Sequence, residues 1–230
     1  MTQRVIELTD FGAAENMMLR EADIPTPGPG QIVVKNKAIG LNYLDTYFRT
    51  GLYPWPNQEK IKIPGSEGVG HVHSTGSGVN FLKEGDKVSY VCPVGAYSEY
   101  ALISEAHAVQ IKVGVDDHDV AAATLKGLTT HYLLHLTFKL ESGMTALCHA
   151  AAGGVGQLMG QWGSEIGATM IGTAGGPEKV EAAIKAGYHH VIDYNSKDFV
   201  AEVMSITNDQ KCNVVYDSVA KSVFPGSLDC

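Results

Sequence analysis

The stretch TALCHAAAGGVGQLMGQWGSEIGATMIGT, residues 145–173, decides the fold of this chain. It opens with a short apolar run and continues through small residues and glycines. Leu158, Trp162 and Ile166 then follow at the spacing of one helix face. A second apolar run occupies residues 168–172. This order predicts a strand, a tight glycine turn, a helix and a second strand, which together make a βαβ unit.

The glycine turn has the spacing of a dinucleotide-binding loop. Ala151, Gly153 and Gly156 stand at the three small-residue positions of G-x-G-x-x-G, with alanine in place of the first glycine. Bare backbone at such a turn lets N–H groups and the positive end of the helix approach a phosphate. Glycine-rich turns are common, so the strand and helix on either side carry the interpretation. Together they predict a pyrophosphate site.

Composition and charge exclude several other classes of protein. The chain has 230 residues, of which 44% are hydrophobic and 18% charged, as in an ordinary globular protein of one large or two modest domains. Its net charge of −8 argues against general nucleic-acid binding. The N-terminus lacks an apolar signal core, and the uncharged stretch 142–164 holds six glycines, too many for a membrane span. Four widely spaced cysteines are typical of free thiols, so we expect a soluble, cytoplasmic protein that binds neither nucleic acid nor membrane.

The sequence pattern changes near residues 111–126, and we expect two domains, 1–120 and 121–230. In the first, short strand-like runs separated by glycine and proline turns predict a β-rich barrel or sandwich. The expected elements are strands at 32–42, 68–76, 86–91 and 96–103 and a helical turn over 43–49. In the connecting segment a helix begins at 120–123, breaks at Gly127 and resumes over 128–136.

The second domain alternates strands and helices, which predicts a parallel, doubly wound sheet. The expected elements are strands at 144–149, 168–173, 190–192 and 213–217 and helices at 154–166, 177–186 and 198–204. The last of these strands is about the fourth of the sheet, whereas a complete dinucleotide fold has six. We therefore expect a C-terminally incomplete sheet.

Several segments, in order, resemble the zinc-independent quinone oxidoreductases of the medium-chain dehydrogenase/reductase superfamily. They are NYLDTYFRTGLYP (42–54), GSEGVGHV (65–72), LKGLTTHYLL (125–134), AAAGGVGQ (150–157), IGTAGGPEK (171–179) and VVYDSVA (214–220). The resemblance implies a GroES-like barrel followed by a Rossmann domain, hydride transfer from NADPH to a small-molecule quinone, and a homodimer. The family's C-terminal segment that returns to the barrel has no counterpart in this sequence.

No metal is expected. Where zinc-using relatives carry a cysteine and a histidine, this sequence has Asn42 and Ser66, an amide and a hydroxyl. An open catalytic zinc site normally needs three protein ligands of the cysteine, histidine or carboxylate type. His131 and His135 share one face of a predicted helix, but two histidines alone do not make a site. We interpret this pair as ordinary helix residues.

The resemblance also implies a set of cofactor-binding residues. They are Asn42, Thr129, Ala152, Gly153, Gly154, Val155, Gly175, Lys179, Tyr194 and Ser218. The strand end at 173–175 lacks the acidic residue that usually binds the ribose hydroxyls of NAD, and Lys179 matches a phosphate-binding lysine. Glu178, expected in the first helical turn, argues the other way. We predict NADPH over NADH. Two interpretations without a ligand stay open. Lys179 is then a solvated helix lysine, and Asp217, after the last strand, is a helix cap.

For catalysis the resemblance implies Asn42, Tyr47 and Tyr53. Asn42 is expected near the nicotinamide, and the tyrosines are expected to shape the quinone pocket, although such aromatics serve as often in packing. A phenol is a weak acid at neutral pH, so we expect no indispensable general acid. Two other functions stay open. One is reduction of activated carbon–carbon double bonds in enones or alkenals, and the other is a non-catalytic NADPH-binding role.

Overall fold

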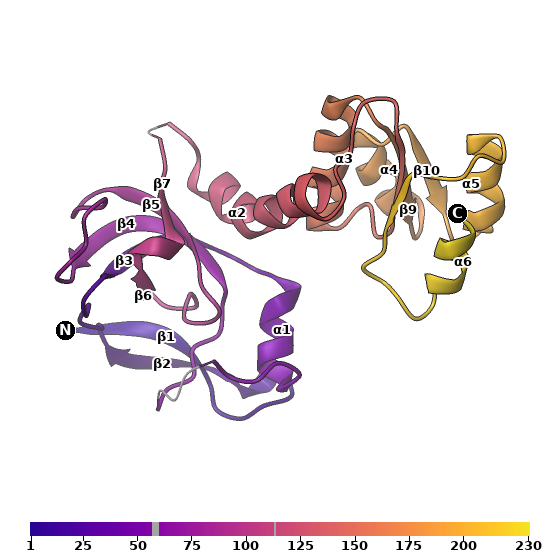
Figure 1. Cartoon of the computed structure of the whole chain (residues 1–230). Coiled ribbons are helices and arrows are strands. Elements are labelled where there is room, and N and C mark those ends of the chain that lie inside the picture. The colour runs from indigo at the N-terminus through magenta and orange to yellow at the C-terminus, as the bar shows by residue number, and fades with distance from the viewer. Residues whose placement is uncertain (57–59, 113) are drawn as a thin grey trace. The chain divides into compact units, whose positions relative to one another are not determined.

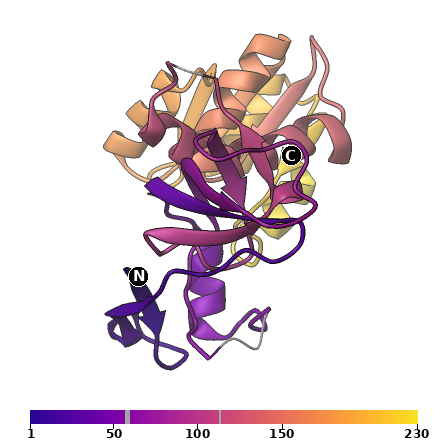
Figure 2. The same cartoon turned by 90° about the vertical axis from the view of Figure 1, so that its left-hand side faces the viewer.

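The chain forms two compact units, Met1–Leu125 and Lys126–Cys230. The computed structural model describes residues 1–56, 60–112 and 114–230. The division between the units falls inside helix α2 (Asp117–Tyr132), which also contains the predicted boundary between residues 120 and 121. In Figures 1 and 2 the first unit runs from indigo to magenta and the second from salmon to yellow.

The first unit is built on a five-stranded antiparallel sheet of order β6-β3-β4-β5-β7. Its strands are β3 (Gln31–Gly40), β4 (Glu67–Thr75), β5 (Lys87–Val91), β6 (Tyr100–Ser104) and β7 (Ala108–Gln110). Alternate side chains of these strands form an apolar core that includes Ile32, Val34, Val88 and Tyr90. The strong apolar alternation of these runs explains why the sequence located three of the strands to within two residues.

The predicted strand over 96–103 is wrong at its start, because β6 begins only at Tyr100. The residues before it form only an isolated β-bridge, Ser98 with Val5 of the N-terminal strand, and also bind a neighbouring loop. Ala96 N–H donates to the carbonyl of Gly65 at 3.1 Å, and Tyr97 N–H donates to that of Pro64 at 2.9 Å. A tertiary contact of this kind leaves no trace in the local pattern of apolar residues.

A hairpin and one helix complete the first unit. Strands β1 (Thr2–Leu8) and β2 (Met17–Asp23) pair antiparallel along their whole length, and the sequence pattern did not single them out. Helix α1 (Tyr43–Thr50) buries Phe48 and ends at Gly51, whose φ of 75° is in the left-handed region that favours glycine. The observed helix confirms the helical turn predicted over 43–49.

The second unit is a four-stranded parallel sheet of order β10-β9-β8-β11 with helices between the strands. Its elements are β8 (Thr145–Cys148), α3 (Gly154–Ile166), β9 (Thr169–Ala174), α4 (Pro177–Lys185), β10 (His190–Asp193), α5 (Phe199–Thr207), β11 (Val214–Tyr216) and α6 (Phe224–Asp229). The chain adds β9 and β10 on one side of β8 and then places β11 on the other. The strand order therefore reverses between β8 and β11, the switch point at which doubly wound sheets bind ligands.

Small residues let α3 lie close to the sheet. A Cβ atom on Gly160 would lie 2.5 Å from the ring of Tyr188, and one on Gly163 would overlap Met170. Met159 and Met170 belong to the core cluster on this side of the sheet. The second core cluster contains Leu147, Ile171, Ile192 and Val203.

The predicted helix break at Gly127 is wrong. Helix α2 runs through this residue and continues as a π-helical turn, Leu133–Thr137. A glycine inside a helix costs about 1 kcal/mol relative to alanine. Burial of Val120 and Leu134 on either side offsets a cost of this size. Within the described part of the chain no helix is both long enough and apolar enough to cross a membrane.

The second core cluster predicts that isoleucine-to-alanine substitutions at a buried and an exposed site differ strongly in their effect on stability. Ile171 in β9 is fully buried, whereas Ile184 in α4 is 56% exposed. Ile171→Ala leaves a cavity and should lower the free energy of unfolding by about 2–5 kcal/mol. Ile184→Ala should change it by less than about 1 kcal/mol. Urea unfolding of both variants measures this, and equal losses would contradict the assigned core.

Candidate functional site

In the first unit the start of α1 carries a cluster of buried polar groups. Asn42 precedes the helix, and its backbone N–H donates to Asp45 Oδ2 at 2.9 Å. Its side-chain Nδ2 donates to Glu67 Oε1 at 2.7 Å, and the other oxygen of Glu67 accepts the N–H of Leu125 at 2.6 Å. The predicted nicotinamide contact Asn42 is thus oriented by a fully buried carboxylate.

Asp45 is the second buried carboxylate of this cluster. Its oxygens accept from Ser66 Oγ at 2.7 Å and from the Tyr97 hydroxyl at 2.8 Å. Burial, with the negative charge of Asp45 beside it, raises the pKa of Tyr97. The same two causes raise the pKa of the Cys92 thiol to about 12, so this cysteine stays protonated at neutral pH.

This donor set does not fit zinc. The amide of Asn42 and the hydroxyl of Ser66 each donate to a carboxylate, and the nearby Cys92 thiol is protonated. Zinc needs thiolate, imidazole or carboxylate ligands in a convergent set. Within residues 1–56, 60–112 and 114–230 no group of three or more such side chains is arranged to hold a metal. In the second unit the rings of His131 and His135 lie 5.1 Å apart and pack against Trp162.

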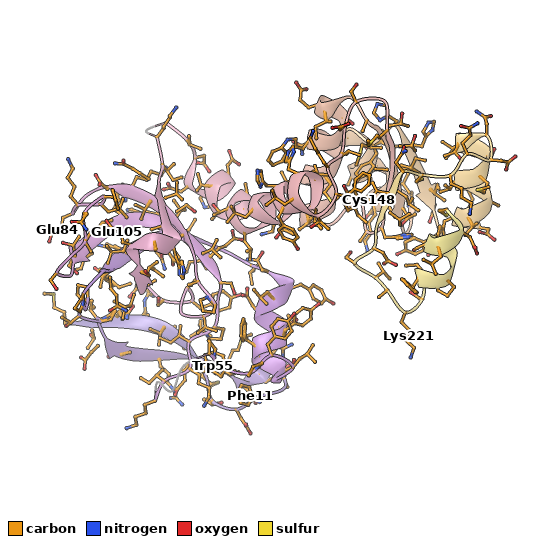
Figure 3. All side chains as sticks on the ribbon, in the orientation of Figure 1. Phe11, Trp55, Glu84, Glu105, Cys148 and Lys221 are labelled. Atoms are coloured by element: carbon orange, nitrogen blue, oxygen red, sulfur yellow. The ribbon has the colours of Figure 1, made fainter. Side chains whose placement is uncertain are left out.

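The structure brings Tyr47 and Tyr53 together. Their ring centroids are 5.3 Å apart, and the backbone N–H of Tyr53 donates to the carbonyl of Tyr47. The two tyrosines belong to a continuous aromatic group made of Tyr43, Tyr47, Tyr53, Phe48, Trp55 and Phe11. Figure 3 labels Phe11 and Trp55 at its far end. Tyr43 is 79% exposed and Tyr53 is 45% exposed, so the group offers an aromatic surface beside the helix that Asn42 begins.

In the second unit the glycine turn after β8 packs tightly against the start of α3. A Cβ atom on Gly156 would lie 2.5 Å from the carbonyl oxygen of Ala150 and 2.7 Å from that of Ala151. The turn therefore passes directly under the first turn of α3, which begins at Gly154. The first N–H groups of a helix have no acceptor within it, and they carry its positive dipole. The predicted phosphate-binding residues Ala152, Gly153, Gly154 and Val155 lie at this helix start.

Beside the turn, the carboxyl ends of the strands enclose a cavity of about 440 Å³. Its lining consists of His149, Ala150, Thr173, Tyr194, Phe199, Val219, Ser222 and Val223. These residues follow β8 and β10, end β9, start α5 or follow β11, so the cavity lies along the carboxyl edge of the sheet. Among the predicted cofactor residues Tyr194 lines it. The sequence did not assign a ligand role to His149, Thr173 or Phe199, although a position just after a strand was a usable signal.

The loop between β9 and α4 is organised by an acidic residue from the next strand. Asp193 Oδ1 accepts the N–H groups of Gly176 and Asn195, each at 3.0 Å, and these bonds lower the pKa of its carboxyl group. Gly175 leaves room for the Tyr194 hydroxyl, which would lie 2.5 Å from an added Cβ atom. Lys179 is exposed in the first turn of α4.

The remaining predicted residues occupy α2 and the turn after β11. Thr129 lies half-buried in α2, and Ser218 is exposed. Asp217 Oδ1 accepts the N–H groups of Val219 and Ala220 at 2.9 and 2.8 Å. Asp217 therefore closes a turn and does not cap a helix as the sequence alternative had it, because α6 begins only at Phe224.

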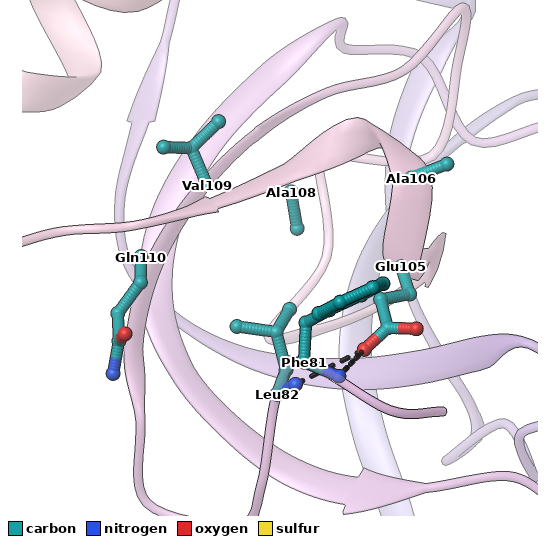
Figure 4. Close-up of a pocket in the computed structure, with 7 residues that line it drawn as sticks. All are labelled: Phe81, Leu82, Glu105, Ala106, Ala108, Val109 and Gln110. Carbon is teal, nitrogen blue, oxygen red and sulfur yellow. Dashed lines mark hydrogen bonds between the residues drawn. The ribbon is translucent and has the colours of Figure 1, made fainter. Parts of the chain in front are cut away.

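The first unit has a hollow of its own, of about 460 Å³ (Figure 4). Its lining includes Phe81, Leu82, Glu105 and Val109. The Glu105 carboxylate accepts the N–H groups of Asn80, Phe81 and Leu82, with the shortest distance 2.6 Å to Phe81. Among the described residues that line this hollow, Glu105 is the only charged one and it closes a loop, and none of them is a predicted site residue.

Comparison with known proteins agrees with the fold of both units. Residues 28–113 match the alcohol dehydrogenase GroES-like domain, and residues 154–230 match the zinc-binding dehydrogenase family. A quinone oxidoreductase of Pseudomonas aeruginosa is 44% identical over 229 residues, which are 98% of this chain and 69% of that protein. A 2-haloacrylate reductase of a Burkholderia species is 40% identical, over 95% of this chain and 67% of that protein. The crystal structure of Escherichia coli quinone oxidoreductase complexed with NADPH superposes with a TM-score of 0.91 at 38% identity, covering all of this chain and 70% of that one.

The chain belongs to the quinone oxidoreductase family. This confirms the family predicted from the ordered sequence segments, and with it the predicted fold class. The first unit is the GroES-like domain, and the parallel sheet of the second unit is Rossmann-like. The residues predicted to bind cofactor and quinone remain predictions for this member of the family.

Gly156→Ala tests the close approach at the glycine turn. The added Cβ meets two backbone oxygens that cannot move without opening the turn, so the free energy of unfolding should fall by about 1–3 kcal/mol. Gly127→Ala is the matched control, because a Cβ atom there meets no described atom within 4 Å. It should stabilise α2 by up to about 1 kcal/mol. Thermal unfolding of both variants gives the comparison, and an unchanged midpoint for Gly156→Ala would contradict the turn geometry.

Proposed function

We propose that this chain is an NADPH-dependent quinone oxidoreductase, which transfers hydride from NADPH to a quinone without zinc. One observation carries the proposal. A turn of alanines and glycines leads into α3 beside a cavity of about 440 Å³ at the carboxyl edge of a parallel sheet. A cavity of this size with few polar groups suits a cofactor. The similarity to quinone oxidoreductases, one of them crystallised with NADPH, supports the same reaction.

NADPH fits the residues of the second unit. The helix start at 152–155 would hold the pyrophosphate, and Gly175, Lys179 and Tyr194 would hold the adenosine phosphate. Thr129 and Ser218 complete the set on this unit, with Asn42 on the nicotinamide side. When bound, NADPH supplies the hydride, and the protein orients it and excludes water. Asp193, the carboxylate bonded to the β9–α4 loop among the residues described, is engaged with backbone N–H groups, and this supports NADPH over NADH.

The quinone is assigned to the aromatic group of the first unit. Exposed rings at Tyr43 and Tyr53 offer faces on which a planar ring can stack, with a contribution of about 0.5–1.5 kcal/mol for each pair. Tyr47 or Tyr53, or water, delivers the proton to the reduced oxygen. Asn42 is held by Glu67 so that its amide keeps one orientation during the reaction.

The second candidate function is reduction of an activated carbon–carbon double bond. The similarity to a 2-haloacrylate reductase favours it, since that protein is nearly as similar as the quinone oxidoreductase. A non-catalytic NADPH-binding role is the third. A homodimer and a cytoplasmic location are part of the main proposal. All four cysteines are free, which supports a reducing compartment.

Turnover with alternative acceptors tests the proposal. NADPH oxidation is followed at fixed protein concentration with ortho- and para-quinones, enones and 2-haloacrylate. We expect the quinones to be reduced with the highest kcat/KM. Tyr47→Phe and Tyr53→Phe should each keep at least about a tenth of the wild-type kcat, because water can replace either phenol.

Three results would contradict parts of this proposal. Faster turnover of enones or 2-haloacrylate would favour the second function. Tight NADPH binding with no acceptor reduced would favour the third. Loss of nearly all turnover in both tyrosine variants, with NADPH affinity unchanged, would show that a phenol is indispensable.

The cofactor preference is tested at Lys179. Lys179→Ala should weaken NADPH binding about tenfold or more and leave NADH binding unchanged, because a charge-assisted bond to the 2′-phosphate is lost. Lys185→Ala is the matched control, since Lys185 lies in the last turn of the same helix and pairs with Glu181 at 2.6 Å. It should change neither affinity. Titration by cofactor fluorescence gives both constants, and equal wild-type affinities for NADPH and NADH would overturn the preference.

A further inference from the structure

His149 is a buried imidazole for which the proposed hydride transfer has no use. It is the first residue after β8 and is only 3% exposed. Its Nδ1 lies 2.9 Å from Thr173 Oγ1 at the end of β9, and its Nε2 lies 3.0 Å from Ser227 Oγ in α6. The ring of Phe199 stands perpendicular to it at 5.1 Å. One side chain thus joins β8, β9, α5 and α6 at the carboxyl edge of the sheet.

The chain of contacts continues to a carboxylate. Ser227 Oγ lies 3.1 Å from Asp217 Oδ2 and 3.0 Å from the carbonyl oxygen of Val223. An ionised carboxylate only accepts hydrogen bonds, and a charged acceptor is stronger than a neutral one. The single hydroxyl proton of Ser227 is therefore directed to Asp217.

The direction of that bond decides the tautomer of His149. Because the Ser227 proton is used on Asp217, its oxygen accepts from His149 Nε2–H. A neutral imidazole with its proton on Nε2 is an acceptor at Nδ1, so the Thr173 hydroxyl donates to it. The four groups make a single directed chain, from Thr173 through His149 and Ser227 to Asp217.

The imidazole is neutral at physiological pH. Burial lowers the pKa of His149, and the negative charge of Asp217 opposes this in part. Among the described residues Asp217 is the charged group that acts on it, and the Tyr194 phenol lines the same cavity. The elements β9, α5 and α6 present Thr173, Phe199 and Ser227 to the ring, none of which ionises in this range.

The segment that this chain ties down is a wall of the cofactor cavity. Val219, Ser222 and Val223 line the cavity and lie between Asp217 and Ser227 in the sequence. The two ends of the segment are bonded to each other, and Ser227 is bonded to His149. Loss of the hydrogen bond between His149 Nε2 and Ser227 Oγ therefore weakens the attachment of α6 to the end of β8.

We propose that His149 is a positioning residue, which as the Nε2–H tautomer fixes α6 and the segment 217–223 and so sets the shape of the cofactor cavity. This inference rests on the proposed NADPH function. It assigns to His149 and Ser227 a role in cofactor affinity without contact with the reacting atoms. It predicts that the bond at Nε2 matters more for affinity than the bond at Nδ1.

Two amide variants separate the two ring nitrogens. The glutamine amide in His149→Gln reaches the position of Nε2 and donates to Ser227. The shorter amide in His149→Asn reaches only the position of Nδ1, where its oxygen accepts from Thr173. We expect His149→Asn and Ser227→Ala to weaken NADPH binding about tenfold, which is about 1.4 kcal/mol. His149→Gln should stay within about threefold of wild type.

Ser164→Ala is the matched control for Ser227→Ala. Ser164 Oγ donates to the carbonyl of Gly187 at 2.5 Å, so this variant also removes one hydroxyl bond from the same unit. Neither Ser164 nor Gly187 lines the cavity. NADPH affinity should be unchanged in this variant.

The chain without NADPH provides a second readout. Nitrogen-15 NMR of the imidazole at pH 7.5 should show the proton on Nε2. Because the lowered pKa of His149 means that the unfolded chain binds the proton more readily, stability should fall as pH drops below about 6.5 towards the folded-state pKa. Above that range the contribution is constant. His149→Gln cannot titrate, so its unfolding midpoint should depend less on pH than that of wild type.

The outcomes separate this inference from the proposed function. Equal losses of NADPH affinity in His149→Asn and His149→Gln would show that the ring only fills space, and would overturn the inference. A proton found on Nδ1 would overturn it as well. A wild-type chain that does not bind NADPH would overturn the proposed function, and the tautomer and pH measurements would then still decide the hydrogen-bond chain.

Discussion

The close approach of backbone to backbone at Gly156 is the constraint on which the second unit depends. The carbonyl oxygens of Ala150 and Ala151 lie where any side chain at 156 would have to go. This contact folds the chain back directly after β8 and starts α3 at the edge of the sheet. The Tyr188 hydroxyl, which donates to the carbonyl of Gly156 at 2.8 Å, holds the first turn of α3 from between the helix and the sheet. The proposed phosphate site at the start of α3 depends on this tight turn.

The first unit uses buried charge for a different purpose. Asp45 and Glu67 are nearly inaccessible, and such carboxylates are tolerated only when every oxygen has a partner. Here the partners are Asn42, Ser66 and Tyr97, together with backbone N–H groups. Asn42 and Ser66, which stand where zinc-using relatives carry ligands, therefore hydrogen-bond to these carboxylates and stabilise the start of α1. A polar network of this kind holds the Asn42 amide in one orientation, as its proposed role beside the nicotinamide requires.

Sequence prediction succeeded where local pattern and tertiary role agree. The helix 154–166 and the strands around it were located well, because apolar spacing, glycine turn and strand length all favoured the same structure. It failed where one local signal was overruled. Gly127 did not break α2, and the segment before Tyr100 bonds to a loop and, through a single bridge, to β1 without extending β6. In both places the deciding energy came from residues distant in sequence.

The sequence by itself determined the βαβ unit, the family, and the absence of zinc-ligand residue types at 42 and 66. These depend on residue identity and spacing, which the chain displays directly. Only the tertiary structure decided that His149, Thr173, Ser227 and Asp217 form one chain. They come from three strand ends and a helix that are up to 78 residues apart in sequence. Parallel strands gather their carboxyl ends at one edge of the sheet, and no local pattern records which side chains meet there.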